Sequence, residues 1–350
     1  MYLSDQTLRI IDANLNRIGE SLRLLEDVAR LLLNDAILSK QLKAMRHELA
    51  TRELSAKEQL LQARNSEGDI GMDIEVSQQT KERDLPAAII ANASRIQESL
   101  RVLEELSKIP GIDLDSDKFK RARFSLYDIE KALLSGVLRK EKKERISGLY
   151  AIIDTQYLEN RRHDEVVNQM LEGGARIIQL RDKYMLKKEL LPIARQLKEL
   201  CTAYNALFIV NDYLDIALAV DADGLHIGQD DLPLKTARKL LPIGKIIGCS
   251  VENVSQAVAA EADGADYIAA GAIYPTQSRA KIETVGLDMI KAIKKSTSLP
   301  LVAIGGINLN NAEEVLAAGA DSIAVISAIM QADSPKEATR QIIDKIGVCN

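Results

Sequence analysis

From Gly148 to the C-terminus, short runs of β-branched and aliphatic residues alternate with longer amphipathic stretches. Eight such runs occur: LYAIID, ARIIQLR, LFIVND, GLHIG, KIIGCS, DYIAAG, PLVAIGG and DSIAVIS. Each connection is long enough for a right-handed helical crossover, so the pattern predicts eight βα units. No G-x-G-x-x-G segment follows any of these strands, which disfavours an open dinucleotide-binding sheet. We therefore predict an α/β fold, a (β/α)8 TIM barrel, for residues 148–350.

The first 147 residues have a different pattern, with long periodic stretches and few glycines or prolines, which predicts helices. Segment 11–30, IDANLNRIGESLRLLEDVAR, recurs 78 positions later at 89–108 as IIANASRIQESLRVLEELSK. RHEL at 46–49 and RFSL at 123–126 are a weaker echo, so the repeated unit is a helix pair. We predict an all-α duplicated helical bundle ahead of the barrel.

The boundary between the two predicted domains, 1–147 and 148–350, lies at the end of a charged run. This run, LRKEKKERIS at 138–147, has no core-facing pattern. Such a run is typical of a solvated helix end or a linker rather than a binding patch.

Three polar residues of each repeat lie on the same helical stripe as its apolar residues. They are Asn14, Arg17 and Ser21 in the first repeat and Asn92, Arg95 and Ser99 in the second. A guanidinium on a core-facing stripe is costly unless an anion or acceptor meets it. The two sets predict either a polar pocket for a phosphate ester or a buried network that fixes helix register. No segment matches the Walker pattern G-x-x-x-x-G-K-[ST].

Composition limits the partners and the location of the chain. The formal net charge is −5 and aromatic residues make up 3% with no Trp, so neither a basic field nor stacking surfaces favour nucleic acid. No stretch has the length of a membrane span and the N-terminus lacks a signal-peptide core, so we expect a cytoplasmic protein. The expected partners are phosphorylated small molecules, and a homo-oligomer is compatible with this sequence.

Polar residues gather where the second, third and fourth predicted strands end, which is where barrels of this kind place their chemistry. Strand alternation puts Gln179, Arg181 and Lys183 on one side, and two cations there indicate a polyanion. Asp212 and one of the acids at 230 and 231 could share Mg²⁺ with substrate phosphates, which predicts a diphosphate site. The other of these two acids is expected to cap the following helix.

The later strand ends carry glycines and hydroxyls that favour a second anion site. The backbone amides at Gly305 and Gly306, and those before the helix at Ser327, are the usual monophosphate site of this fold. Two anion sites at one mouth imply two phosphorylated substrates joined with loss of diphosphate. His226 is expected to be a packed core histidine, the alternative being a hydrogen bond to a site residue.

Seven motifs in this order and spacing, namely QLRDK, ND, HIGQDD, GCS, PTQSR, IGGI and VIS, resemble those of thiamine-phosphate synthase. The resemblance covers residues 148–346. It implies condensation of 4-amino-2-methyl-5-(diphosphooxymethyl)pyrimidine with 4-methyl-5-(2-phosphoethyl)thiazole, carboxylated or not, to thiamine phosphate. It also implies that the C–O bond to diphosphate breaks first and that the thiazole nitrogen captures the resulting cation. The rival is a related tautomerase or regulatory barrel without synthase activity.

The same resemblance implies site residues. Those for the pyrimidine diphosphate are Gln179, Leu180, Arg181, Asp182, Lys183, Asn211, Ser250 and Arg279. Those for the thiazole phosphate are Thr276, Gln277, Ser278, Gly306, Ile326 and Ser327. Mg²⁺ would be held by Asp212 and Asp231, and catalytic roles fall to Arg181, Lys183 and Arg279. The family's usual P-T-x-T-K ends here in Ser278 and Arg279, which leaves Arg279 and Lys281 both as candidates for the diphosphate contact.

The helical half resembles a domain found joined to this synthase and similar to a monofunctional hydroxymethylpyrimidine-phosphate kinase. The two A-N-x-x-R-[IL]-x-E-S-L-R-x-L-E segments carry this resemblance. It implies that one half makes the diphosphate that the other consumes. The alternative is a dimerisation or scaffold module.

Overall fold

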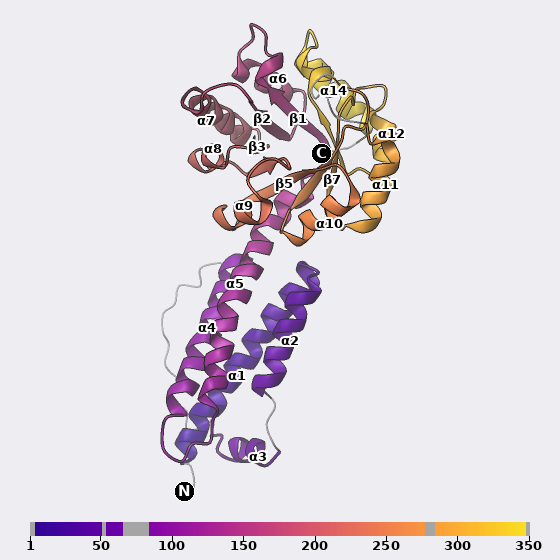
Figure 1. Ribbon diagram of the computed structural model, residues 1–350. Coiled ribbons are helices and arrows are strands. Elements are labelled where there is room, and N and C mark those ends of the chain that lie inside the picture. Colours follow the sequence, from indigo (N-terminus) through magenta and orange to yellow (C-terminus); the bar gives the residue numbers. More distant parts are fainter. Residues whose placement is uncertain (1–3, 51–53, 66–83, 277–283, 348–350) are drawn as a thin grey trace. The chain divides into compact units, whose positions relative to one another are not determined.

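A computed structural model describes residues 4–50, 54–65, 84–276 and 284–347. The chain divides into two compact units, Met1–Leu138 and Arg139–Asn350 (Figure 1). Within the ranges described, no helix combines the length and apolar character needed to cross a bilayer.

The second unit is a closed parallel barrel of eight strands in sequence order, as predicted. The strands are β1 (Gly148–Asp154), β2 (Ile177–Arg181), β3 (Leu207–Asn211), β4 (Gly224–Ile227), β5 (Ile246–Val251), β6 (Tyr267–Ala270), β7 (Leu301–Ile304) and β8 (Ser322–Val325). The helices are α6 (His163–Glu172), α7 (Lys187–Ala203), α8 (Leu214–Ala219), α9 (Leu234–Leu240), α10 (Val254–Ala262), α11 (Gly286–Ser296), α12 (Ala312–Ala317), α13 (Ser327–Met330) and α14 (Pro335–Ile346). β1 pairs with both β2 and β8, which closes the barrel.

Side chains alternate between the two faces of each barrel strand. Residues such as Ile178 and Leu180 face the helices and form the larger apolar core. Residues such as Ile152 and Tyr267 fill the barrel interior. Gly248 is required there, because an added Cβ would lie 2.1 Å from the ring of Tyr267. The interior is therefore packed below the carboxyl ends of the strands, and the space for a ligand lies above it.

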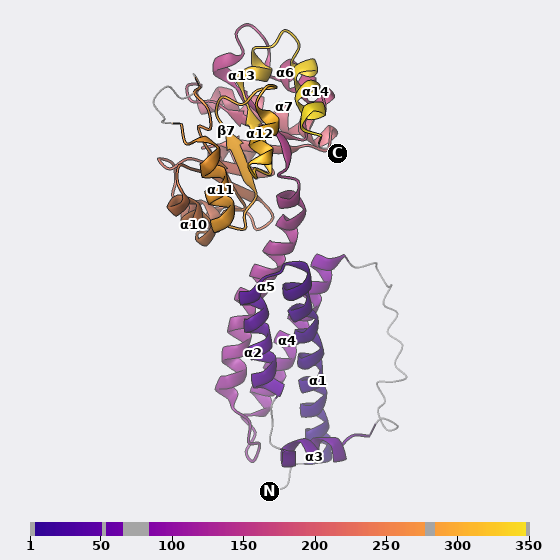
Figure 2. The same cartoon turned by 90° about the vertical axis from the view of Figure 1, so that its right-hand side faces the viewer.

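The first unit is helical, with α1 (Asp5–Asp27), a π-helical turn (Val28–Leu32), α2 (Ala36–Ala50), α3 (Leu54–Gln62), α4 (Leu85–Leu106) and most of α5 (Ser116–Glu144). Figure 2 shows α1, α2, α4 and α5 running side by side. α1 and α4, which contain the two copies of the repeat, pack directly against each other. Ser4 and Asp84 cap these two helices through their side chains.

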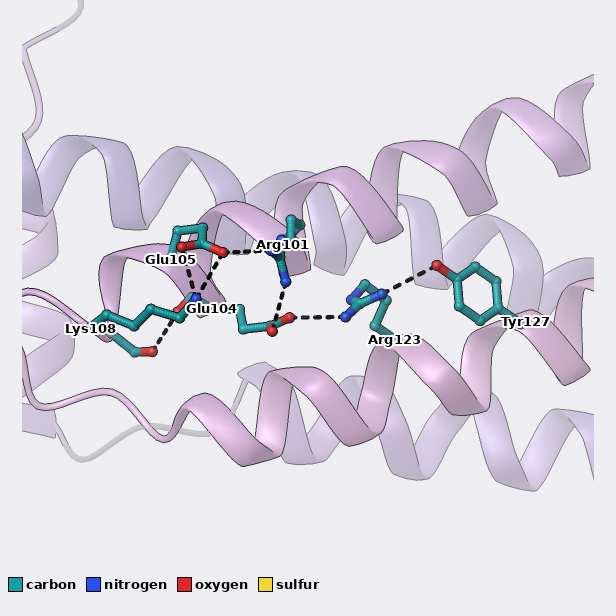
Figure 3. Close-up of polar contacts among 7 residues, drawn as sticks. Arg101, Glu104, Glu105, Lys108, Arg123 and Tyr127 are labelled. Atoms are coloured by element: carbon teal, nitrogen blue, oxygen red, sulfur yellow. Dashed lines mark hydrogen bonds and ion pairs between the residues drawn. The ribbon is translucent and has the colours of Figure 1, made fainter.

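The repeat is present in the packing as well as in the sequence. Glu26 of α1 is buried and pairs with Arg46 of α2, with 2.8 Å between Oε2 and Nε. Glu104, 78 positions after Glu26, is buried equally and pairs with Arg123 of α5 at 3.2 Å. Figure 3 shows this second pair, with Arg101 as a further partner of Glu104. The repeated unit is therefore a helix pair, as the echo at 46–49 and 123–126 predicted, and in each copy a buried ion pair that was not predicted joins the two helices.

The charged run at 138–147 contains the end of a helix, as one of the two alternatives predicted, but part of it contacts the barrel and not solvent. α5 continues through this run to Glu144, and Arg139 contacts Asp266 of the barrel unit at 2.6 Å. Lys142 donates to the carbonyl oxygen of Gly244 at 2.9 Å. This segment has no core-facing apolar pattern because its partners are charged and polar groups of the barrel.

Candidate active site at the barrel mouth

One cavity opens among the residues that follow the barrel strands, with about 840 Å³ of empty space, part of it open to solvent. Its floor is apolar, formed by Ile152, Ala269, Ile304 and Ala324. Eight of the residues implied by resemblance line it: Gln179, Arg181, Asn211, Ser250, Thr276, Gly306, Ile326 and Ser327. The structure thus brings residues of both expected anion sites to one cavity, as a two-substrate reaction requires.

Arg181 is held at the cavity wall by an acid that the sequence analysis missed. Asp154 ends β1 directly beside Arg181 in the β1–β2 register and accepts a hydrogen bond from Arg181 Nη1. The Asp154 side chain is buried, and its other oxygen accepts from the amide of Gln156 at 3.1 Å. The guanidinium is therefore oriented before any ligand arrives, with Arg181 among the lining residues.

A cation and two carboxylates lie next to Asn211. Lys183 Nζ contacts Asp212 Oδ2 at 2.5 Å, and the Gly228 amide donates to Asp231 Oδ2 at 2.7 Å. Burial and the neighbouring Asp231 carboxyl raise the pKa of Asp212. Burial would also raise the pKa of Asp231, but its interactions with Asp212 and with the Gly228 amide outweigh burial and lower that pKa. Two neighbouring carboxyls that shift each other's pKa in this way are stabilised together by a bound cation.

The backbone at Asp212 is held in the left-handed region, with φ at +62°. Its amide donates to the carbonyl oxygen of His226 at 2.8 Å, which ties the end of β3 to β4. Non-glycine residues adopt this conformation rarely, and it clusters at ligand sites. Asp212 therefore combines a rare backbone conformation with a carboxylate that contacts Lys183.

The residues present fit a magnesium ion. Over the described ranges, no group of three or more His, Cys, Asp or Glu side chains forms a complete metal cage. Mg²⁺ usually takes one or two carboxylates and fills its other positions with substrate phosphates and water. Asp212 and Asp231 supply that number of carboxylates. The helix cap expected from Asp230 or Asp231 is absent, because the N-cap of α9 is Pro233 and no side chain bonds there.

Two residues implied by resemblance point away from the cavity. Leu180 faces the helices and belongs to the outer core. Asp182 is buried, and its Oδ1 accepts from the amides of Tyr184 at 2.8 Å and Met185 at 2.6 Å. Its visible role is to fix the loop after β2, which in turn positions Lys183.

The glycines after β7 shape the opposite wall. Gly305 and Gly306 have φ of +102° and +67°, and the carbonyl oxygen of Gly306 accepts from Nδ2 of Asn311 at 3.0 Å. Thr276 and Gly306 both line the cavity. Gln277, Ser278, Arg279 and Lys281 lie outside the described residues.

The expectation for His226 was wrong. It lines the cavity, and its Nε2 lies 3.0 Å from Ser250 Oγ while Nδ1 lies 3.2 Å from the hydroxyl of Tyr267. The ring is buried as expected, but it is a hydrogen-bonding partner of a site residue. Tyr267 and its neighbour Tyr150 were missed because aromatic residues inside strands are typical of plain packing.

In the bundle, the six candidate residues divide between the core and the surface. Asn14, Ser21 and Ser99 are buried, and Asn14 donates to the carbonyl oxygen of Ile10 one turn earlier at 2.8 Å. The buried guanidinium that we expected is absent, because Arg17 and Arg95 are exposed. Both lie at the edge of the stripe, where a long side chain reaches water.

The second repeat shows the same local bond, since Asn92 donates to the carbonyl oxygen of Ala88 at 2.9 Å. Both bonds stay within a single helix, so they neither form a pocket from all six residues nor join α1 to α4.

Comparisons with known proteins agree with the two-part organisation. Residues 149–329 match the family model described as thiamine monophosphate synthase, and residues 9–132 match the ThiD2 family. Both matches agree with the family resemblances inferred from the sequence motifs of the two halves.

The relatives and a solved structure point the same way. A thiamine-phosphate synthase of Thermosynechococcus vestitus is 38% identical over 97% of this chain and 94% of that protein. One of Synechocystis sp. is 38% identical over 98% and 97%. A thiamine phosphate pyrophosphorylase structure from Pyrococcus furiosus has 42% identity and a TM-score of 0.54, covering 58% of this chain and 96% of that one. The chain therefore belongs to the thiamine-phosphate synthase family and is a transferase of thiamine biosynthesis.

Proposed function

We propose that the barrel cavity binds the pyrimidine diphosphate beside β2–β5 and the thiazole phosphate beside β6–β8, and joins them with release of diphosphate. The observation that carries this proposal is the single cavity lined by both Arg181 and Gly306. Gln179, Asn211 and Ser250 would hold the pyrimidine side. Thr276, Ile326 and Ser327 would hold the thiazole phosphate, with Gln277 and Ser278 as further contacts.

The diphosphate would be bound by Arg181, Lys183 and Arg279, and Asp212 with Asp231 would hold Mg²⁺. When bound, the ion would supply positive charge that stabilises the departing diphosphate. The contact between Lys183 and Asp212 at 2.5 Å supports this assignment, because it puts the ammonium beside the carboxylates that would hold the ion. Arg181, oriented by Asp154, would meet the negative charge that develops as the C–O bond breaks.

This chemistry asks little of acid or base groups. The attacking thiazole nitrogen has a lone pair and carries no proton, so the protein has to align the two rings and neutralise the leaving group. The apolar floor supports this function, because it offers the rings a surface without competing nucleophiles.

The test is to mix both substrates with Mg²⁺ and the full chain and to measure thiamine phosphate and diphosphate together. Equal amounts of the two products are expected. Formation of neither product by folded protein that binds thiazole phosphate would contradict the assignment and favour the tautomerase-like or regulatory alternative.

We also propose that the helical unit phosphorylates hydroxymethylpyrimidine phosphate to the diphosphate. The match of residues 9–132 to the ThiD2 family supports this. The specific observation that favours the scaffold alternative is the bonding of Asn14 and Asn92 to their own helices.

A coupled assay separates the two alternatives. The full chain receives hydroxymethylpyrimidine phosphate, ATP, Mg²⁺ and thiazole phosphate, and thiamine phosphate is the expected product. The control supplies the diphosphate directly. Product in the control alone would contradict the kinase proposal and favour a scaffold.

A further inference from the structure

A continuous chain of hydrogen bonds crosses the barrel interior beneath the cavity. Gln179 Nε2 donates to the hydroxyl of Tyr150 at 2.9 Å, and this hydroxyl lies 2.8 Å from that of Tyr267. The Tyr267 hydroxyl lies 3.2 Å from Nδ1 of His226, and Nε2 of His226 lies 3.0 Å from Ser250 Oγ. The chain thus links five strands, and both of its ends, Gln179 and Ser250, line the cavity.

Packing alone does not account for the two phenols. Tyr150 and Tyr267 are 1% and 0% exposed, and aliphatic residues and alanines surround them in the interior cluster. A buried hydroxyl costs free energy unless it is hydrogen-bonded, whereas an aliphatic side chain fills such space without that cost. The barrel also requires glycine at Gly248 to make room for the Tyr267 ring. The hydroxyls therefore suggest a role beyond filling volume.

The chain has a direction. Burial raises the pKa of both phenols, so each keeps its single proton. Because Tyr150 accepts from Gln179, we assign its proton to the contact with Tyr267. In this assignment the Tyr267 hydroxyl donates to Nδ1 of His226. The imidazole then carries its proton on Nε2 and donates it to Ser250 Oγ.

This direction decides what Ser250 offers to a ligand. An oxygen that already accepts from His226 Nε2 keeps its own proton available for the cavity. If the chain ran the other way, Ser250 would donate to His226 and could only accept from a ligand. The diphosphate oxygens that gain negative charge as the C–O bond breaks accept hydrogen bonds, so the inferred direction suits a diphosphate and the reverse does not.

We propose that Tyr150, Tyr267 and His226 are positioning residues that hold Ser250 as a hydrogen-bond donor toward the leaving diphosphate. This inference rests on the proposed function, which puts the pyrimidine diphosphate beside Ser250. The three residues act through Ser250 and contact no reacting atom in this proposal. Removing one hydrogen bond from this series should therefore impair turnover without changing the binding of the thiazole phosphate.

The first test is Tyr267→Phe, which removes one oxygen and keeps the ring. We expect kcat to fall about tenfold, the effect of one well-placed hydrogen bond in the transition state, with an unchanged KM for thiazole phosphate. The matched control is Tyr204→Phe on the outer wall, where the hydroxyl bonds Asn168 at 3.2 Å, and its kcat should equal that of the wild type. Equal kcat in both variants would overturn the proposal.

The second test is a double-mutant cycle with Ser250→Ala. If Tyr267 acts through Ser250, adding Tyr267→Phe to Ser250→Ala should cost little more, whereas independent packing effects would multiply. Multiplying effects would overturn the inference while leaving the site assignment intact. An Ser250→Ala variant with normal kcat and normal KM for the pyrimidine diphosphate would contradict the proposed function itself.

If the Tyr267→Phe variant does not fold, a measurement on the unmodified enzyme tests the same proposal. The protein has three histidines, so the ¹⁵N spectrum of its imidazoles can be assigned. Near neutral pH we expect His226 to carry its proton on Nε2 and to have an unprotonated Nδ1. A proton on Nδ1 would overturn the proposed direction.

Discussion

Gly306→Ala is expected to weaken binding of the thiazole phosphate and to spare the pyrimidine diphosphate. At this position φ is +67°, in the left-handed region that favours glycine. An added Cβ would lie 2.7 Å from the carbonyl oxygen of Pro275 and 2.7 Å from Cβ of Tyr274. Neither is the free end of a flexible side chain, so the backbone of one of the two loops has to move. The segment displaced is the one that holds Thr276 beside Gly306.

The structure provides a control that separates strain from displacement. Gly347 has nearly the same φ, +64°, with nothing within 4 Å of an added Cβ. Both alanine variants should lose about 1 to 2 kcal/mol of unfolding free energy, the usual cost of an L-residue in this conformation. Only Gly306→Ala adds a loop shift at the cavity. Because each 1.4 kcal/mol is tenfold in affinity, we expect KM for thiazole phosphate to rise about tenfold or more.

The assay varies one substrate at a saturating concentration of the other and follows thiamine phosphate. For Gly306→Ala, KM for the pyrimidine diphosphate should stay within about twofold of the wild type. Denaturant unfolding should report a larger stability loss for Gly306→Ala than for Gly347→Ala, because only the former also displaces backbone. Equal losses toward both substrates would mean that the phosphate site is misplaced. A Gly347→Ala variant with the same kinetic defect would mean that strain, and not displacement, is responsible.

Three further predictions follow from the carboxylates. Asp212→Asn should lower turnover in a way that excess Mg²⁺ partly restores, since one carboxylate remains; no response to Mg²⁺ would count against the metal assignment. Because the pKa of Asp212 is raised and Mg²⁺ competes with the proton there, the acid limb of the rate profile should move to lower pH as Mg²⁺ increases; a limb independent of Mg²⁺ would contradict this. Arg46→Met should lower the unfolding free energy by about 3 kcal/mol, because it leaves the buried Glu26 without its ion-pair partner. Arg123→Met should lower it by less, because Glu104 still pairs with Arg101. Equal losses in urea denaturation would refute this reasoning.

The barrel was predictable from the sequence because its strands are buried on both faces and therefore form short apolar runs. Five of the eight runs end in a polar residue and three in glycine. Because all eight strands end at the same mouth, Arg181 and Ser250 could be assigned to it from the sequence alone. The bundle was predictable for a different reason. A repeat of twenty residues at a fixed offset leaves one helix pair used twice as the simplest solution.

The residues that were missed are those whose function depends on a neighbour distant in the sequence. Asp154 is an ordinary strand-end acid until barrel closure puts it beside Arg181. Tyr150 and Tyr267 come from β1 and β6, which do not pair, so only the size of their side chains lets the hydroxyls meet across the interior. The charges at Arg139 and Lys142 were assigned to solvent for the same reason. Periodicity reports which face of an element is apolar, but it does not identify the partner of a buried charge.

The two walls of the cavity differ in the kind of donor they offer, and this difference bears on the order of bond making. Among the described lining residues, the cation is Arg181, on the β2 side, while Gly305, Gly306 and Ser327 opposite offer neutral amides and a hydroxyl. In the proposed assignment, a cationic intermediate formed between the two walls would be attracted to the departing diphosphate and would not be repelled by Gly305, Gly306 or Ser327. A thiazole phosphate held by lysines or arginines would raise the potential where that cation forms. If these neutral donors hold the acceptor's phosphate, they do so without this penalty, which would favour capture of the cation by the thiazole nitrogen.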